Sequence, residues 1–398
     1  IKYIYYRCLS VNGHIPSISN CKMKIFVPKE INREKRVAAS PDTVKKFLGL
    51  GHSVAIESGA GNQSNFGDSN YSEAGATIAN EAASADIILK VGTPNPDEIS
   101  TYKDGSILIA MLDPFNNREL VDQIRKKNIT AFAMELMPRI TRAQSMDVLS
   151  SQSNLAGYKA VIQASNSFNK AMPMMMTAAG TIAPAKVMVF GAGVAGLQAI
   201  ATAKRLGAVV SATDVRLAAK EQVESLGGKF VIIESDELKD AETAGGYAKE
   251  MSEDFKRQQA ELISNTLANQ DIAICTALIP GKKAPTLITE KNVMSMKPGS
   301  VIIDLAAQSG GNCELSKPGE TVEVNGVSII GATDFASDIP QDASALYSKN
   351  LLNFMTILFN AESGELNIDW EDEIIINTAL TKEGAFIHKE FILSLIHI

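Results

Sequence analysis

The sequence has few cysteines and no excess of basic residues, and both shortages exclude classes of protein. Its 398 residues include 4 cysteines, whose spacing fits neither a metal site nor a dense disulfide framework, so we expect a reducing compartment. Lysine and arginine number 38 against 45 acidic residues, a net charge of −7. No basic cluster with interleaved aromatic residues occurs, which disfavours binding to nucleic acid or to an anionic membrane surface.

Long apolar runs are lacking as well. No uninterrupted apolar run reaches the ~18 to 20 residues that a membrane-spanning helix needs, so we do not expect the chain itself to cross a bilayer. A composition of 45% hydrophobic and 21% charged residues is typical of a globular chain that buries sizeable cores. The length predicts two or three domains.

Short apolar runs alternate with helical patterns, which is typical of an α/β fold. In the first half we expect strands at 24–27, 53–57, 85–91, 106–110 and 129–134. In the second half we expect six more, which suffice for a complete doubly wound sheet, at 186–190, 208–213, 229–233, 271–276, 300–305 and 327–330. Ser40 is the expected cap of a helix that Pro41 opens and that stops near Gly49 and Gly51.

The two ends and one crossing segment define the expected domains. Residues 1–22 lack a clear fold signal, and we interpret them as translation upstream of a true start at Met23; residues 391–398 stay unassigned. Segment 344–360 carries apolar residues at helical spacing and should return to the first domain. We therefore predict two Rossmann-like doubly wound α/β domains, residues 23–149 plus 340–390 and residues 150–339, with the binding site in a cleft between them.

The most informative motif is a buried-strand pattern at 185–190 that leads into three glycines and a helix. Gly191 permits a tight turn, Gly193 lets a pyrophosphate approach the backbone, and Gly196 lets the helix pack closely on the strand. A second apolar run ends in Asp214, which is placed to accept hydrogen bonds from an adenosine ribose. The order of these features predicts NAD binding; the structural alternative is a glycine-rich turn with an exposed aspartate.

Two polar segments supply further candidates. Residues 138–154 form a loop rich in polar side chains that could hold the carboxamide and ribose of a nicotinamide, with Arg139 and Asp147 paired to keep it rigid. A charged linker between domains is the structural alternative. The insertion at 234–270 contains Gly245 and Gly246 beside Tyr247, which could form a mobile lid, or equally a helix cap followed by a surface tyrosine.

The segment from Met134 to Tyr158 closely resembles a loop of the NAD(H)-binding domain I of proton-translocating nicotinamide nucleotide transhydrogenase, on its alpha subunit. The resemblance extends through 173–181, 191–216, 244–251 and 276–281, and covers roughly residues 23–388. The motifs at 27–30 and 36–41 are shared with the wider alanine dehydrogenase and transhydrogenase superfamily.

The resemblance implies direct hydride transfer from NADH on this chain to NADP⁺ on a partner domain, which regenerates NADPH and is coupled by membrane subunits to inward proton flow. It also implies a homodimer at the inner face of a bacterial cytoplasmic membrane, or on the matrix side in a mitochondrion. No metal and no acid–base residue are expected, because hydride passes from carbon to carbon and the protein supplies orientation.

The resemblance assigns site residues as well. The expected catalytic residues are Arg139, Gln144, Asp147, Ser150 and Tyr247. The expected cofactor-binding residues are Arg139, Ile140, Thr141, Gln144, Ser145, Met146, Asp147, Gly191, Ala192, Gly193, Val194, Gly196, Asp214, Val215, Arg216, Gly246, Gln259 and Leu278.

Two other functions remain as alternatives. An alanine dehydrogenase would need a cation to hold the substrate carboxylate, a lysine and a histidine; Arg36 and Lys90 could serve, but segment 109–115, where that family carries its histidine, has none. Of the four histidines, His52 stands beside Gly51 at a strand start, where we expect a surface role. A non-catalytic NAD-sensing module is the other alternative, which the dinucleotide motif alone does not rule out.

Overall fold

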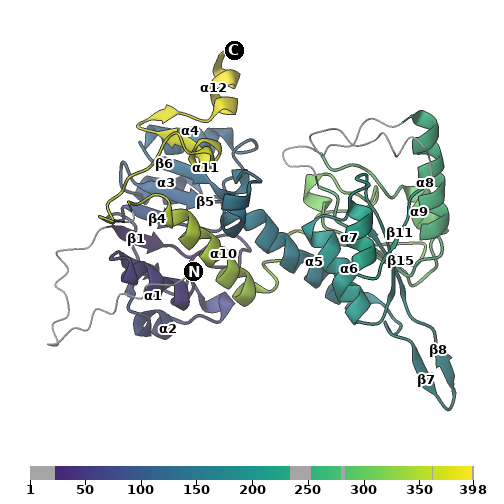
Figure 1. The fold of residues 1–398 in the computed structure, drawn as a ribbon. Coiled ribbons are helices and arrows are strands. Elements are labelled where there is room, and N and C mark those ends of the chain that lie inside the picture. Colours follow the sequence, from purple (N-terminus) through teal and green to yellow (C-terminus); the bar gives the residue numbers. More distant parts are fainter. Residues whose placement is uncertain (1–22, 234–251, 279–282, 361, 397–398) are drawn as a thin grey trace.

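The computed structural model describes residues 23–233, 252–278, 283–360 and 362–396, which form two α/β units (Figure 1). Two helices, α5 (Val148–Ser167) and α10 (Pro340–Thr356), run between the units and pack against each other. None of the helices described is both long and apolar enough to span a bilayer.

The first unit contains an eight-stranded sheet in the order β17-β16-β6-β5-β4-β1-β2-β3. Strands β1 to β6 are parallel, and their order 3-2-1-4-5-6 is that of a doubly wound sheet. The later part of the chain adds β16 antiparallel to β6, and β17 beside it. The bounds of the strands are β1 Lys24–Val27, β2 Ser53–Glu57, β3 Thr77–Ala79, β4 Ile87–Leu89, β5 Ile107–Ala110, β6 Thr130–Ala133, β16 Ala379–Lys382 and β17 Ala385–Phe386.

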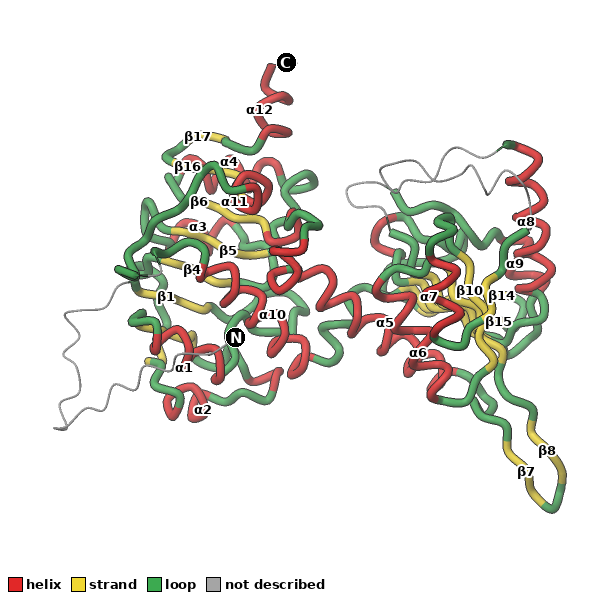
Figure 2. Tube along the Cα trace, viewed as in Figure 1, coloured by secondary structure: helices red, strands yellow, loops and turns green. Residues whose placement is uncertain are grey.

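The second unit contains a seven-stranded sheet in the order β11-β10-β9-β12-β13-β15-β14. Its first six strands in this list repeat the parallel 3-2-1-4-5-6 order, and β14 pairs antiparallel with β15. The bounds are β9 Lys186–Phe190, β10 Val209–Thr213, β11 Lys229–Phe230, β12 Ile272–Cys275, β13 Val301–Asp304, β14 Thr321–Val324 and β15 Val327–Gly331. A separate hairpin of β7 (Met175–Thr177) and β8 (Gly180–Ile182) extends away from this unit (Figure 2).

Helices and short 3-10 turns connect the strands. In the first unit they are α1 Pro41–Gly49, η2 Asn62–Ser64, α2 Asp68–Glu73, α3 Pro96–Thr101, α4 Arg118–Lys126, η3 Met134–Leu136, η4 Thr141–Met146, α11 Glu373–Thr378 and α12 Lys389–Ile396. In the second unit they are α6 Val194–Arg205, α7 Ala219–Ser225, α8 Glu253–Leu267, α9 Glu290–Ser295 and η6 Ala307–Ser309.

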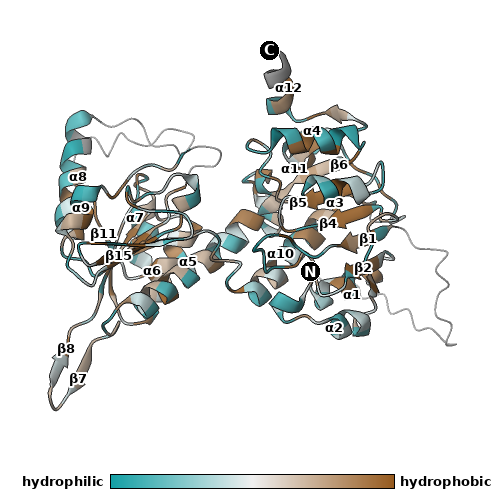
Figure 3. Cartoon of the chain, turned by 180° about the vertical axis from the view of Figure 1, so that it is seen from behind, coloured by the Kyte–Doolittle hydropathy of each residue, from teal (hydrophilic) through white to brown (hydrophobic). Residues whose placement is uncertain are grey.

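Each sheet is buried on both faces, as a doubly wound fold requires (Figure 3). Along β4, Ile87 and Leu89 belong to one buried apolar cluster and Ile88 to another, because successive side chains point to opposite faces. Val187 and Met188 of β9 are divided between two clusters in the same way. The predicted fold class of two Rossmann-like α/β units is therefore confirmed, whereas the predicted domain bounds and the cleft stay predictions.

Local signals agree with several of these elements. Ser40 caps α1, since its hydroxyl accepts a hydrogen bond from the backbone N–H of Thr43, and Pro41 is the first residue of the helix. Helix α10 buries Leu351 and Phe354 and packs against α1, η2 and η4, as expected for a segment that returns to the first unit. The tail that the sequence left unassigned contributes most of α12.

Candidate functional site

The glycine turn lies between β9 and α6. Gly191 has a positive φ of 93°, a conformation that favours glycine. A Cβ atom on Gly196 would lie 1.8 Å from the carbonyl oxygen of Gly191, so only glycine allows the helix to sit this close to the turn. A Cβ atom on Gly193 would meet nothing within 4 Å. Open space therefore lies beside the start of α6, where Val194 begins a helix whose N–H groups favour a phosphate.

Asp214 follows β10 and closes the turn from the other side. Its carboxylate accepts hydrogen bonds from the backbone N–H groups of Ala192 at 2.7 Å and Arg216 at 2.8 Å. The Arg216 guanidinium also contacts it at 3.0 Å. Burial opposes its charged form, but the hydrogen bonds from Arg216 and Ala192 prevail and lower the pKa of Asp214. The carboxylate is thus charged, and exposed Val215 stands next to it.

Strand order reverses between β9 and β12, which is the usual ligand position in a doubly wound sheet. Thr276 follows β12 and donates a hydrogen bond to the carbonyl of Gly191 at 3.0 Å. Gln259 on α8 accepts from Ile233 N–H at 2.9 Å and donates to the Val231 carbonyl at 3.2 Å, so it lies where β11 ends. Leu278 is half exposed. These residues surround the same edge of the sheet as the glycine turn.

A buried asparagine that the sequence analysis missed supports this edge. The Asn312 side chain accepts from Ala277 N–H at 3.0 Å and donates to the carbonyls of Ala277 at 2.9 Å and Pro285 at 2.8 Å. Asn312 has no exposed surface. It therefore fixes the backbone that leaves β12 at the reversal point. A Gly-Gly-Asn sequence at 310–312 was the only local signal.

The polar loop is held by contacts other than the one predicted. Asp147 caps α5 by accepting hydrogen bonds from the N–H of Ser150 at 2.9 Å and from its hydroxyl. No ion pair between Arg139 and Asp147 occurs in the described part of the chain, so the expected pairing is wrong, because the carboxylate serves as the helix cap. Arg142 instead forms a bidentate pair with Asp372, at 2.6 and 2.9 Å.

Helix α10 clamps the same loop from the side. The amide groups of Asn350 and Asn353 both donate to the Ser145 carbonyl at 2.9 Å. Met146 is buried and Ile140 packs against the first core. Exposed side chains are left on Arg139, Thr141, Gln144 and Ser145.

The structure places the two predicted groups on different units and connects them through α5. Helix α5 carries Asp147 and Ser150 at its start, and a Cβ atom on its Gly157 would lie 2.1 Å from the carbonyl of Ala195 in the first turn of α6. Ten residues of helix, about 15 Å, separate Asp147 from this contact. Gly246 and Tyr247 lie outside the described residues.

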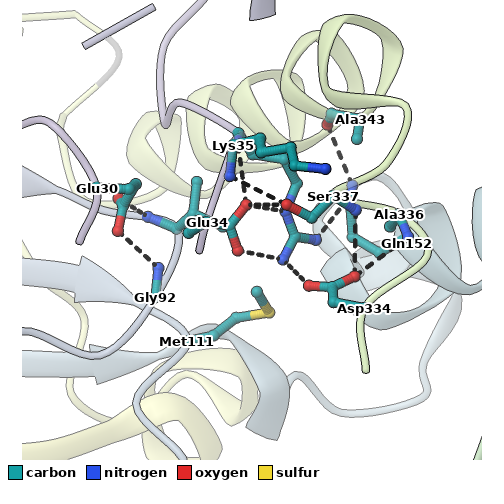
Figure 4. A network of polar contacts seen from close by, with 12 residues as sticks. Glu30, Glu34, Lys35, Gly92, Met111, Gln152, Asp334, Ala336, Ser337 and Ala343 are labelled. Atoms are coloured by element: carbon teal, nitrogen blue, oxygen red, sulfur yellow. Dashed lines mark hydrogen bonds and ion pairs between the residues drawn. The ribbon is translucent and has the colours of Figure 1, made fainter. Parts of the chain in front are cut away.

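The cations considered for an alanine dehydrogenase are engaged by internal carboxylates. Lys90 is fully buried, 2.7 Å from Glu98 and 3.2 Å from Glu30. Arg36 is bound by Glu34, and Glu34, Gln152, Asp334 and Ser337 converge around it (Figure 4).

His52 does not have the expected surface position. It is 5% exposed, and its ring lies 4.7 Å from that of Phe359. The segment that follows α10 supplies Phe359, and this long-range contact was not apparent at Gly51 and Ser53, the neighbours of His52 in the sequence. His52 is therefore a packing residue in the first unit.

Glu135, directly after β6, is another residue that the sequence analysis missed. One carboxylate oxygen accepts from the N–H groups of Leu112 at 2.8 Å and Asp113 at 2.5 Å. The other oxygen is buried and has no hydrogen-bond partner among the described residues. Burial raises the pKa of Glu135 to about 7, although those backbone N–H groups oppose the shift. Within the described ranges, no cluster of side chains suitable for a metal ion occurs.

A doubly wound sheet with a glycine turn at its strand reversal and a charged aspartate after the second strand defines a dinucleotide-binding α/β protein. The chain belongs to the alanine dehydrogenase/PNT family. The description "Alanine dehydrogenase/PNT, N-terminal domain" matches residues 26–156, and "Alanine dehydrogenase/PNT, C-terminal domain" matches residues 160–389.

Several known proteins are similar over most of their length. The chain is 56% identical over 376 residues to an NAD(P) transhydrogenase alpha subunit of Rhodospirillum rubrum, covering 92% of this chain and 98% of that one. A crystal structure of transhydrogenase from Sinorhizobium meliloti matches with a TM-score of 0.84 and 50% identity, over 92% of this chain and 100% of that one. Alanine dehydrogenase of Bacillus subtilis is 32% identical over 305 residues, 73% of this chain and 72% of that one. The predicted resemblance is thereby confirmed.

Proposed function

We propose that this chain is the NAD(H)-binding component of an NAD(P) transhydrogenase, in which hydride passes directly from NADH to NADP⁺ held on a partner domain and so regenerates NADPH. The observation that carries the proposal is the pair formed by the glycine turn and Asp214, whose charged carboxylate is fixed by Ala192 and Arg216. The similarity to transhydrogenase alpha subunits, which is higher than that to alanine dehydrogenase, supports it.

The residues fit NADH, and each group has a separate task. The open space at Gly193 and the N–H groups at the start of α6 would receive the pyrophosphate. Asp214 would accept hydrogen bonds from the adenosine ribose. The predicted residues from Arg139 to Ser150 would hold the nicotinamide end, on a loop that α10 and Asp372 fix. NADH supplies the hydride, and the chain's side chains orient it rather than move protons.

Further aspects of the proposal concern assembly. We infer that the chain acts at the inner face of a membrane, beside an NADP-binding subunit and membrane subunits that couple transfer to proton flow, as the relatives' subunit names suggest. We also infer a homodimer. The hairpin of β7 and β8 supports it, because this hairpin extends from the second unit (Figure 1) and exposes Met174, Met175, Met176 and Ile182.

The alternative of an alanine dehydrogenase finds less support. Such an enzyme needs a cation for the substrate carboxylate, but Arg36 already binds Glu34 and Asp334, and Lys90 binds Glu30 and Glu98. No observation favours the NAD-sensing module over a catalytic component.

The test is a hydride-transfer assay on the purified chain. NADH bound to the chain is mixed with an NADP⁺ analogue whose reduced form absorbs at its own wavelength, with and without a transhydrogenase NADP-binding subunit. Transfer is expected only when both proteins are present. Reduction of NAD⁺ by L-alanine without the partner, or no transfer with it, would contradict the proposal.

A further inference from the structure

A single buried guanidinium joins the first unit to both of the segments that lead into the second. Arg36 lies in the loop between β1 and α1 and is 3% exposed. Its Nε and Nη2 atoms donate to the two carboxylate oxygens of Glu34 at 2.8 and 2.7 Å. Its Nη1 atom donates to Gln152 at 2.8 Å, and Nη2 also contacts Asp334 (Figure 4).

The partners of Arg36 occupy the two places where the chain passes between the units. Gln152 is on α5, the first connection, and Asp334 precedes α10, the second. Two further contacts close the network: the Gln152 amide donates to the Ala343 carbonyl at 3.2 Å, and the Ser337 hydroxyl donates to Glu34 at 3.0 Å. Rotation of one unit against the other would therefore separate Arg36 from at least one partner.

The chemistry of the guanidinium makes this junction selective for one geometry. Burial alone would lower the pKa of Arg36, but the hydrogen bond to Glu34 and the charge of Asp334 raise it above its ordinary value. A buried charge that loses a partner is strongly unfavourable, and a planar guanidinium satisfies several acceptors only in a fixed arrangement. A lysine carries the same charge but cannot reproduce this fork.

We propose that Arg36 is a positioning residue that fixes the angle between the two units, and thereby holds the loop at 139–150 in register with the glycine turn at 191–196. Its consequence for catalysis rests on the proposed function, since a dinucleotide would span both groups. The angle itself does not depend on that function.

The chain contains a matched control at the same junction. Lys35 pairs with Asp338 at 2.7 Å and so links the same two segments, one residue away from Arg36. This pair is 42% and 38% exposed, and solvent-exposed pairs contribute little. Lys35→Gln therefore removes a cation from the junction without removing the buried one.

The angle can be measured with spin labels on the full chain. Cysteines are introduced at Glu73 of α2 and Lys220 of α7, which are both exposed, and Cys8 and Cys21 are replaced by serine, whereas Cys275 and Cys313 are buried. Labelled chain is diluted with unlabelled chain so that distances within one chain dominate. We expect a narrow distance distribution for the parent and for Lys35→Gln, and a shifted or broadened one for Arg36→Lys and for the milder Asp334→Asn.

Transfer kinetics give the second readout. At saturating NADH, Arg36→Lys should slow single-turnover transfer about 10²-fold, because small displacements of reacting centres cost this much. Its Kd for NADH should change less than threefold, a division that a merely destabilised fold would not produce. Unchanged distances in both Arg36→Lys and Asp334→Asn would overturn the inference. Changed distances together with no transfer in the parent chain would instead contradict the proposed function and leave the inference standing.

Discussion

At the scale of single residues, Asp214 determines which dinucleotide the chain accepts. Its pKa is lowered and its carboxylate is mostly buried, so a 2′-phosphate would meet a fixed negative charge with only Arg216 in compensation. We predict that NADH binds at least tenfold more tightly than NADPH, since a factor of ten needs only ~1.4 kcal/mol.

The substitution Asp214→Asn should reduce this preference, because it removes the charge and keeps the shape. Fluorescence titration of both nucleotides against the parent and the variant measures the change. Equal affinities for NADH and NADPH in the parent would contradict the assignment of Asp214.

Glu135 should make the stability of the chain depend on pH. Its folded pKa of about 7 is above the ordinary value of 4.5, so the folded state favours the protonated acid. A raised acid pKa means that its contribution is present below about pH 4.5 and is lost as pH rises toward 7, on the order of 3 kcal/mol in total. Glu135→Gln, which stays neutral, should therefore flatten the fall in stability between pH 5 and 7.

Urea unfolding at pH 5, 6, 7 and 8 measures this effect. The exposed carboxylate Glu73 offers a control, since Glu73→Gln should leave the pH dependence of the parent intact. If Glu135→Gln and the parent lose stability in parallel across this range, another group titrates.

At the scale of elements, the glycine turn separates folding from binding. Gly196→Ala would place a Cβ atom 1.8 Å from the Gly191 carbonyl and force α6 away from β9, so we expect a large loss of stability. Gly193→Ala meets nothing within 4 Å, so its melting temperature should stay close to that of the parent while NADH binding weakens. Circular dichroism and NADH titration distinguish the two; unchanged NADH affinity in Gly193→Ala would place the pyrophosphate elsewhere.

The support behind β12 offers a second test of an element. Asn312→Leu removes three buried hydrogen bonds at Ala277 and Pro285, at a cost of ~1–3 kcal/mol for each group left unsatisfied. Since Ala277 lies at the strand reversal, NADH affinity should fall as well.

Thr381→Val is the matched control for stability, because it removes a buried hydroxyl that donates to Ile129 at 2.8 Å in the first unit. It should lower the melting temperature without affecting NADH. Equal NADH affinity in Asn312→Leu and the parent, measured by calorimetry, would show that Asn312 supports only the fold.

The elements that the sequence predicts are those whose signal is local. The bounds of β1, β2 and β9 agree with the apolar runs, and the glycine turn was found because all its components lie within 30 residues. Strands β3, β14, β16 and β17 were missed, since they are short, lie toward sheet edges and pair with partners that the sequence does not reveal. Asn312 and the Arg36 network were missed for a related reason: their partners are up to 298 residues away.

At the scale of the whole molecule, the structure divides the site between two units and leaves their relation to a few contacts. Helices α5 and α10 make both connections, and Arg36 binds beside each. The turn near Gly193 and the loop near Asp147 are each fixed within their own unit. Substrate placement therefore depends on the junction as much as on either site, which local sequence patterns do not describe.

The hairpin of β7 and β8 should decide the oligomeric state. It exposes Met176 to 78%, together with Met174 and Met175, and apolar residues clustered on a projecting hairpin are typical of a surface that another chain covers. Met176→Glu places a charge in that surface, so we expect light scattering after gel filtration to show a fall from a dimer to a 42.6 kDa monomer. Met294 of α9 is 51% exposed, and Met294→Glu should leave the dimer intact. A monomeric parent chain, or a dimer that persists in Met176→Glu and also after removal of residues 174–182, would show that the hairpin is not the contact.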